Sequence, residues 1–212
     1  MASSLDYSDA PQRTSQWWEA RVGKVTASRI ADVMARTKTG YAASRNNYLA
    51  ELVVERLTGK PTEGFSSTAM MWGIEKEPMA RDAYSAARGE LVTEVGFLPH
   101  PTIPMTGASP DGTVPPSGIV EIKCPNTAQH IEYLMTKEPP QKYYYQMQWQ
   151  MACAMATFCD WVSYDPRMPE NLRLLIVRIE RDDDTIKVLE DEVQKFLAEL
   201  NEKVKALKEM TL

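Results

Sequence analysis

Three residues near the middle of the chain have side chains and a spacing that suit metal-assisted hydrolysis. Asp111 lies between a proline and a glycine, and after nine further residues come Glu121, Ile122 and Lys123. The segment Gly118–Cys124 alternates in polarity, which predicts a β-strand with Glu121 and Lys123 on one face and Ile122 directed into the core. A hairpin between Asp111 and this strand would bring the two carboxylates side by side.

Two adjacent carboxylates repel each other, and a divalent cation bound between them relieves that repulsion. Hard oxygen ligands favour Mg²⁺ or Mn²⁺, and the backbone carbonyl of Ile122 can add another oxygen. Lys123 would then lie beside the cation, where its ammonium can hold a water molecule for attack. These groups together predict hydrolysis of a phosphodiester. The simpler alternative is a solvent-exposed ion pair between Glu121 and Lys123, but the Pro-Asp-Gly sequence at this separation favours the hydrolytic site.

Hydrophobic periodicity and turn residues predict the elements that must position these groups. Helices are predicted from residue 16, over Arg29–Ala35, through Tyr48–Leu57 to a stop at Gly59, and over about 67–88, about 142–155 and 186–208. Strands are predicted at Leu91–Leu98, Ile103–Gly107, Gly118–Cys124, Phe158–Tyr164 and Leu172–Glu180, with a turn-rich link at 109–116. This order predicts an α/β (α+β) fold in which helices flank a central mixed sheet. We expect a single domain over residues 1–212, with residues 1–13 as a flexible arm.

The composition excludes several classes of protein. With 43% hydrophobic and 25% charged residues, the chain is neither disordered, collagen-like nor a coiled-coil rod. We expect no transmembrane helix and no secretion signal, because the sequence has no apolar run of the required length. Cys124, Cys153 and Cys159 form no CxxC pair, which favours a reducing cytoplasm over a disulfide scaffold or a zinc site.

The net charge of −5 argues against a protein that wraps DNA, because such proteins are usually basic. The charge is unevenly distributed, however. Residues 11–60 carry nine Lys and Arg against four Asp and Glu, whereas residues 180–212 carry six against ten. The first quarter of the chain can therefore face an anion while the last segment faces water.

The run SPDG followed by GIVEIKCP resembles the PD-(D/E)xK nuclease signature, and in particular the lambda-exonuclease-like (YqaJ-type viral recombinase) family. Further matches lie on both sides in the same order, over about residues 17–180. They are Trp18-x-x-x-Arg21-x-Gly23-x-x-Thr26-Ala27-Ser28, Trp72-Gly73-x-x-x-Glu77, Tyr143-x-x-Gln146-x-Gln148 and Tyr164-Asp165-Pro166-Arg167-Met168. The resemblance implies a restriction-endonuclease-like core.

The resemblance also implies roles for the acidic residues and the lysine. Asp111 and Glu121 resemble the metal ligands of the family, and Lys123 resembles its catalytic lysine. Glu77 falls where the family places a further acidic residue that helps to hold the metal. One or two Mg²⁺ ions would bind there, and two could stabilise both the attacking and the leaving oxygens.

A glutamine on the helix that follows is a further candidate. Gln146 and Gln148 point to different faces of a helix, so only one should reach the site. The resemblance favours Gln148 as the residue that orients the water or the phosphate. The alternative is that a glutamine among aromatic residues is a hydrogen-bonded core group.

Arg21, Ser28 and Ser109 resemble positions that bind a 5′-terminal phosphate. A guanidinium binds phosphate through two hydrogen bonds, and hydroxyl groups add further donors. The alternatives are a surface ion pair for Arg21 and helix capping for Ser28. The sequence departs from the family at Gln129, where the family can carry an arginine that completes the pocket. The resemblance therefore does not determine how strongly the 5′ phosphate is selected. His130 lies next to Gln129 in the sequence.

The activity that the resemblance implies is a Mg²⁺-dependent exonuclease acting on linear double-stranded DNA. Such an enzyme degrades one strand in the 5′-to-3′ direction, releases mononucleotides and leaves 3′ single-stranded overhangs for phage-type recombination by strand annealing. The resemblance implies a ring-shaped homotrimer around DNA and a single-strand annealing protein as partner, and the terminal helix at 186–208 could serve either. The alternatives are an endonuclease or repair nuclease with the same core, and a non-catalytic DNA-end-binding module.

Overall fold

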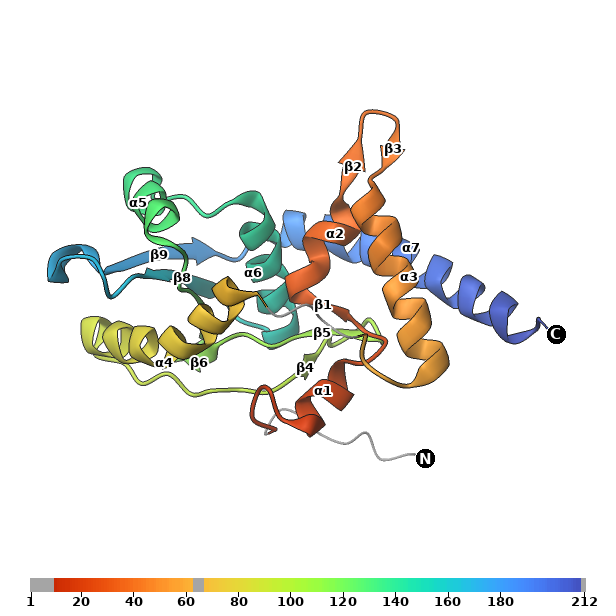
Figure 1. Ribbon diagram of the computed structural model, residues 1–212, viewed down its shortest axis with the longest axis horizontal. Helices are drawn as coiled ribbons and strands as arrows, with labels where there is room; N and C mark the ends of the chain where they lie inside the picture. The colour runs from red at the N-terminus through yellow and green to blue at the C-terminus, as the bar shows by residue number, and fades with distance from the viewer. Residues whose placement is uncertain (1–9, 63–66, 211–212) are drawn as a thin grey trace.

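The computed structural model describes residues 10–62 and 67–210, and its main feature is a four-stranded mixed sheet (Figure 1). β7 and β8 run parallel, β6 pairs antiparallel with β7, and β9 pairs antiparallel with β8. In spatial order the strands are β6 (Gly112–Val114), β7 (Gly118–Lys123), β8 (Phe158–Tyr164) and β9 (Leu174–Glu180). The predicted class, helices flanking a mixed sheet, is confirmed.

The shorter strands form a second sheet and a hairpin. In the second sheet β5 (Thr106–Ala108) pairs with β1 (Val25–Thr26) in parallel and with β4 (Leu98–Pro99) in antiparallel orientation. The hairpin of β2 (Arg36–Thr37) and β3 (Gly40–Tyr41) projects from the helices at the top of Figure 1.

The helices have termini that the local sequence explains. α3 and α4 both end at a glycine with a left-handed backbone, Gly59 and Gly89, and the Ser67 side chain caps α4 by accepting from the Met70 N–H. The α-helices are α1 (Ser15–Arg21), α2 (Ile30–Met34), α3 (Ala43–Thr58), α4 (Thr68–Arg88), α5 (Thr127–Thr136), α6 (Gln141–Ala154) and α7 (Asp183–Lys208). The described residues also contain the 3₁₀ turns η1 (Ala27–Arg29) and η2 (Glu170–Leu172).

The two faces of the main sheet are covered by different helices. On one face, Ala80 and Tyr84 of α4 pack with Val120 and Ile122 of β7. On the other face, residues of α5 and α6 pack with Ile119. Because side chains alternate along a strand, Glu121 and Lys123 share the face of Ile119 and are directed toward α6.

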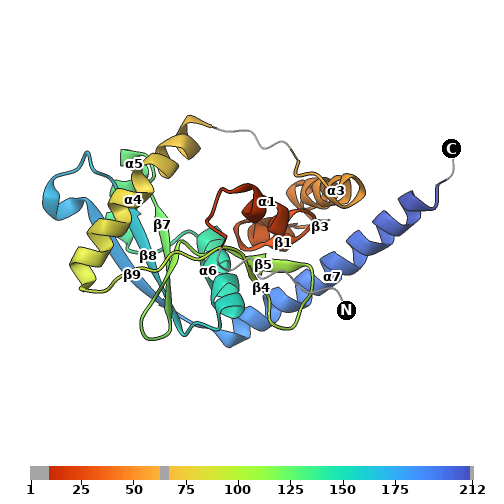
Figure 2. The ribbon, with the colours of Figure 1, turned by 90° about the horizontal axis from the view of Figure 1, so that it is seen from below.

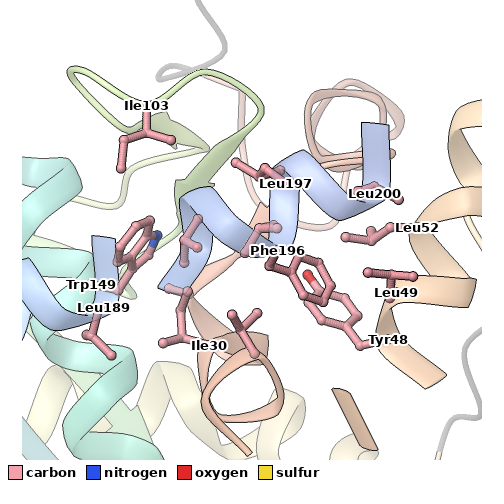
Figure 3. Packing of buried hydrophobic residues seen from close by; sticks show 14 of the residues in the cluster. Ile30, Tyr48, Leu49, Leu52, Ile103, Trp149, Leu189, Phe196, Leu197 and Leu200 are labelled. Carbon is pink, nitrogen blue, oxygen red and sulfur yellow. The ribbon is translucent and has the colours of Figure 1, made fainter. Parts of the chain in front are cut away.

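A third core lies away from the main sheet, where residues of α2, α3, α6 and α7 pack together (Figure 3). Tyr48 of α3 stacks on Phe196 of α7, with ring centroids 5.6 Å apart. Trp149 of α6 belongs to this core, whereas Met147 and Met151 of the same helix pack against the sheet. α6 is therefore buried on two sides and joins the sheet to the helical part of the molecule.

Several sequence predictions differ from the structure. Most of the predicted strand at 91–98 is irregular, with one bridge at Thr93, and the predicted link at 109–116 contains β6. β6 pairs with only three residues of β7, too few for a visible alternating pattern. Neither α5 nor the β2–β3 hairpin was predicted.

The predicted arm is held by the rest of the chain at its end. Residues 1–9 lie outside the described residues. The Gln12 side chain donates to the carbonyls of Val95 (3.0 Å) and Pro110 (2.8 Å), and Arg13 forms an ion pair with Glu77. Gln12 and Arg13, at the end of the predicted arm, therefore contact the rest of the chain. No helix within the two described ranges combines the length and apolar character needed to cross a bilayer.

Candidate active site

Asp111 lies directly before β6 and contacts the strand that carries Glu121. Its backbone N–H donates to the carbonyl of Val120 (3.1 Å), and its Oδ2 accepts a hydrogen bond from the N–H of Ile122 (2.6 Å). The β6–β7 hairpin pairs Gly112 with Val120, so Asp111 is held opposite the middle of β7. Asp111 and Glu121, ten positions apart in the sequence, thus lie on adjacent chain segments in the fold.

Glu121 is fixed by three donors on its two carboxylate oxygens. The Oε1 atom accepts from the amide of Gln146 (2.7 Å) and pairs with the ammonium of Lys123 (2.5 Å). The Oε2 atom accepts from the amide of Gln150 (2.6 Å). The Glu121 residue is only 2% exposed, so these donors fix the direction in which its remaining lone pairs point.

The prediction that Gln148 reaches this site is wrong. Its amide donates to the carbonyl of Glu180 (2.9 Å), and its Oε1 accepts from the N–H of Asp182 (2.9 Å), so it ties α6 to the chain between β9 and α7. Gln146, two positions earlier, reaches Glu121 instead, and Gln150 was missed. Gln146 and Gln150 are four residues apart and therefore lie on the same face of α6. This spacing could have predicted that both reach Glu121, but α6 is buried on two sides, so the sequence does not indicate which face meets the site.

Glu77 lies in the same cleft but is engaged by arginines. Arg81, one turn further along α4, contacts it at 2.8 Å, and Arg13 forms a second ion pair with it. Among residues 10–62 and 67–210, no three His, Cys, Asp or Glu side chains are grouped closely enough to form a ready metal cluster. The preformed part of the site therefore consists of Asp111 and Glu121.

The acidic residues determine the protonation states in the site. Burial, followed by the charges of Glu121 and Glu77, raises the pKa of Asp111 well above its ordinary value, although Lys123 partly opposes this. Burial alone would lower the pKa of Lys123, but the charges of Glu121 and Asp111 outweigh it and raise that pKa. Lys123 is therefore an ammonium at neutral and alkaline pH, a hydrogen-bond donor and a positive charge.

The residues present fit a hard divalent cation. The two carboxylates lie on adjacent chain segments and offer oxygen ligands, and the negative charges of Glu121 and Glu77 add to burial in raising the pKa of Asp111. Mg²⁺ is commonly held by one or two carboxylates together with waters and substrate phosphates, so a complete protein cage is unnecessary. Ile122, whose carbonyl was predicted as a further ligand, also lines the cleft.

The predicted phosphate-binding residues lie in the same cleft, which has a volume of about 930 Å³. The Ser109 hydroxyl accepts from the indole of Trp17 (2.9 Å) and from Arg21 (3.4 Å). The Arg21 guanidinium lies over the Trp17 ring, 4.3 Å from its centroid, and burial lowers the pKa of Arg21 to about 10. Arg21 remains charged at neutral pH, and its contacts are with Trp17 and Ser109 rather than in the surface ion pair considered above.

Ser28 and Gln129 also line the cleft. The Ser28 hydroxyl lies 3.4 Å from that of Thr26, which precedes η1 without a side-chain cap. His130, next to Gln129, is buried and bonds to the Ser163 hydroxyl (2.7 Å) and the Leu172 carbonyl (2.8 Å). His130 is thus a structural contact within the sheet region, outside the cleft lining.

The cleft brings together three distant parts of the chain. Its lining includes residues of α1, of α4 and of the carboxyl end of β7. Figure 2 shows α4 on one side and α1 on the other, with β7 between them. Arg21 with its hydroxyl neighbours and the carboxylates of Asp111 and Glu121 thus share one open groove, an arrangement that can place an anion beside a bound cation.

Comparison with known proteins agrees with this geometry. Residues 16–157 match the family model described as the YqaJ-like viral recombinase domain. The chain is similar to LHK-Exo from Laribacter hongkongensis, described as an alkaline exonuclease, with 52% identity and a TM-score of 0.86 over 92% of this chain and 96% of that one. The complex of LHK-Exo with dAMP gives 54% identity with the same TM-score and the same coverage of both chains.

A more distant structure, a phage-related exonuclease from Haemophilus somnus 129PT, shares the fold. Its identity is 16% and its TM-score 0.72, over 87% of this chain and 96% of that one. A search of curated proteins gave no match. The resemblance predicted from the sequence is confirmed: the chain belongs to the YqaJ-like viral recombinase family.

Proposed function

We propose that this protein is a Mg²⁺-dependent exonuclease that degrades one strand of linear double-stranded DNA from its 5′ end. It releases mononucleotides and leaves a 3′ single-stranded overhang. The observation that carries the proposal is the presence of Asp111, Glu121 and Lys123 in the same cleft as Arg21 and its hydroxyl partners. The relatives described as exonucleases, one of them bound to dAMP, support the same class of substrate.

The metal would be held by Asp111, Glu121 and the carbonyl of Ile122, with Mn²⁺ able to replace Mg²⁺. The ion would supply positive charge at the reacting phosphate. Glu77 would join as a further ligand when it exchanges its arginine partners for the cation, which would allow one or two ions per site. Gln146 and Gln150 hold the Glu121 carboxylate in one orientation throughout.

Lys123 would position the attacking water and stabilise negative charge on the phosphate. Its raised pKa keeps the ammonium protonated, so it donates hydrogen bonds and does not accept the proton of the water. Arg21, Ser28 and Ser109 would bind the 5′-terminal phosphate. Gln129 lines the same cleft as a neutral side chain, which would make that selection weaker than an arginine there would.

We further propose a homotrimeric ring around DNA, acting in the cytoplasm of a bacterial host on behalf of a phage or prophage. An annealing protein would receive the 3′ strand during recombination. The uneven charge of the chain supports a basic channel with an acidic exterior. Cys124, Cys153 and Cys159 are buried free thiols, which fits a reducing compartment.

A digestion series tests the proposal. Linear and covalently closed duplexes are incubated with and without Mg²⁺, and the linear duplexes carry either 5′-phosphate or 5′-hydroxyl ends. We expect mononucleotide release from linear DNA only, only with Mg²⁺, and faster with a 5′ phosphate. Cleavage of closed circles would favour an endonuclease instead, and binding without cleavage would favour an end-binding module. Lys123→Ala should remove turnover without unfolding the protein, and an active Lys123→Ala variant would contradict the assigned role.

A further inference from the structure

Arg167 lies at the same end of the main sheet as the catalytic lysine. β7 and β8 are parallel and pair Lys123 with Ser163, so their carboxyl ends meet at one edge. The chain leaving β8 at this edge carries Asp165 and Arg167, and Arg167 lines the active-site cleft. None of the roles assigned above uses this arginine.

The guanidinium of Arg167 is fixed on its inner side by a buried carboxylate. Its Nε donates to Oδ1 of Asp165 (2.7 Å), and its Nη2 donates to Oδ2 (3.0 Å) and to the carbonyl of Pro125 (3.3 Å). Asp165 also accepts from the Thr127 hydroxyl (2.6 Å) and from the Arg167 N–H (3.0 Å). Its side chain is 0% exposed, whereas that of Arg167 is 47% exposed.

The face of the same guanidinium is held by an aromatic ring of the opposite wall. It lies over the indole of Trp72, 4.4 Å from the ring centroid, and Trp72 belongs to α4. Stacking of this kind leaves the in-plane N–H groups free to bind an anion. Within the described residues, Nη1 of Arg167 donates to no protein acceptor, so its N–H groups are available.

The charges of the cleft differ in how they are compensated. The partners of Arg13 and Lys123, which are Glu77 and Glu121, line the cleft beside them. Asp165 does not line it, so the carboxylate of this pair is turned away from the cleft while the cation faces it. An anion in the cleft thus meets Arg167 without meeting its counter-charge.

We propose that Arg167 binds a backbone phosphate of the DNA, on a wall of the cleft separate from Arg21, Ser28 and Ser109. The inference rests on the proposed function and adds a contact that does not depend on the 5′ end. The alternative is that the pair with Asp165 only fixes the segment after β8.

The chain contains a closely matched control. Arg178 forms the same two-bond pair with a fully buried carboxylate, Asp160 (2.9 and 3.0 Å), and lies over the Phe158 ring at 3.6 Å. Its side chain is 41% exposed, but it does not line the cleft. Arg167→Gln and Arg178→Gln therefore each remove a two-bond pair between an arginine and a buried carboxylate, and only the first changes the cleft.

The experiment measures binding of a linear duplex in EDTA at several salt concentrations, with thermal unfolding of each variant. The logarithm of the binding constant falls with the logarithm of the salt concentration, and losing one phosphate contact makes this slope less steep by about 0.7 to 0.9. For Arg167→Gln we expect that change and about tenfold weaker binding, as for a charge-assisted hydrogen bond. Arg178→Gln should keep the wild-type slope and affinity, although its unfolding temperature should fall about as much as that of Arg167→Gln.

Arg167→Lys keeps the charge but loses the two-bond geometry, so it should retain the wild-type slope with weaker binding. If Arg167→Gln does not fold, the affinity of Arg167→Lys tests the phosphate contact instead. An unchanged slope in Arg167→Gln, unchanged affinity in Arg167→Lys, or an equal loss in Arg178→Gln would overturn the inference. Failure of the proposed function looks different, because the wild-type protein itself would then release no mononucleotides from linear DNA in the presence of Mg²⁺.

Discussion

Gln150 donates its side-chain amide to Oε2 of Glu121 at 2.6 Å, and so fixes the carboxylate oxygen that Gln146 and Lys123 leave free. We predict that Gln150→Ala lowers the rate of digestion about 10- to 100-fold, the usual effect of losing a residue that orients a metal ligand. The Mg²⁺ concentration for half-maximal rate should rise, because Glu121 is no longer held in one orientation. A Mg²⁺ titration of the initial rate measures both effects.

Gln148→Ala is the matched control two residues away. It leaves the carbonyl of Glu180 and the N–H of Asp182 without their partner, so we expect a loss of about 1 to 3 kcal/mol of stability. The rate per folded molecule and its Mg²⁺ dependence should stay near wild type. Equal kinetic losses in both variants would show that the glutamines act only through the packing of α6.

Asp111→Asn should separate metal binding from folding. The charge on Asp111 is repelled by Glu121 and Glu77 in a buried position, so its removal should raise the unfolding temperature in EDTA. Mg²⁺ should raise the unfolding temperature of the wild-type protein by several degrees and that of the variant much less. Thermal scans with and without Mg²⁺ test this, and an equal Mg²⁺ response in both proteins would mean that the cation binds elsewhere.

Arg13→Ala should make Glu77 more available to a cation. Arg13 and Arg81 both pair with Glu77, and an exposed ion pair contributes up to about 1 kcal/mol. We therefore expect the Mg²⁺ concentration for half-maximal rate to fall about two- to fivefold. Arg36→Ala is the control, because the exposed Arg36 side chain also pairs with a largely buried carboxylate, that of Glu192, away from the cleft. A higher Mg²⁺ requirement in Arg13→Ala would instead indicate that Arg13 holds Glu77 in its binding position.

Asp165 should make the protein sensitive to acid. Burial acts to raise its pKa, but hydrogen bonds from Arg167 and Thr127 outweigh it and lower the pKa to about 2. Since the folded pKa lies below the ordinary value of 3.8, this carboxylate stabilises the fold above about pH 4. That stabilisation is lost as the pH falls from about 4 to about 2. Chemical unfolding across this range should show a shallower loss for Asp165→Asn than for wild type, and identical slopes would contradict the assignment.

Local sequence patterns were sufficient for the elements that carry the central groups. The alternation of Gly118–Cys124 predicted β7, which the structure places at Gly118–Lys123, and the apolar spacing of 186–208 predicted most of α7. The Asp111–Glu121 relationship was also predictable, because a hairpin of this length involves only neighbouring residues. The strand predicted at 91–98 failed because, among these residues, only Thr93, through a bridge to Thr113, and Leu98, in β4, have a sheet partner.

The sequence by itself indicated the fold class and the acidic pair with its lysine, because both depend on residue type and short-range spacing, and it indicated the family through motifs matched in order over about residues 17–180. The tertiary structure alone decided which glutamines hold Glu121, that Arg13 reaches Glu77, and that Arg167 stacks on Trp72. These contacts join segments that are distant in sequence, and α6 is buried on two sides, so no periodicity along the chain records which of its faces meets the site.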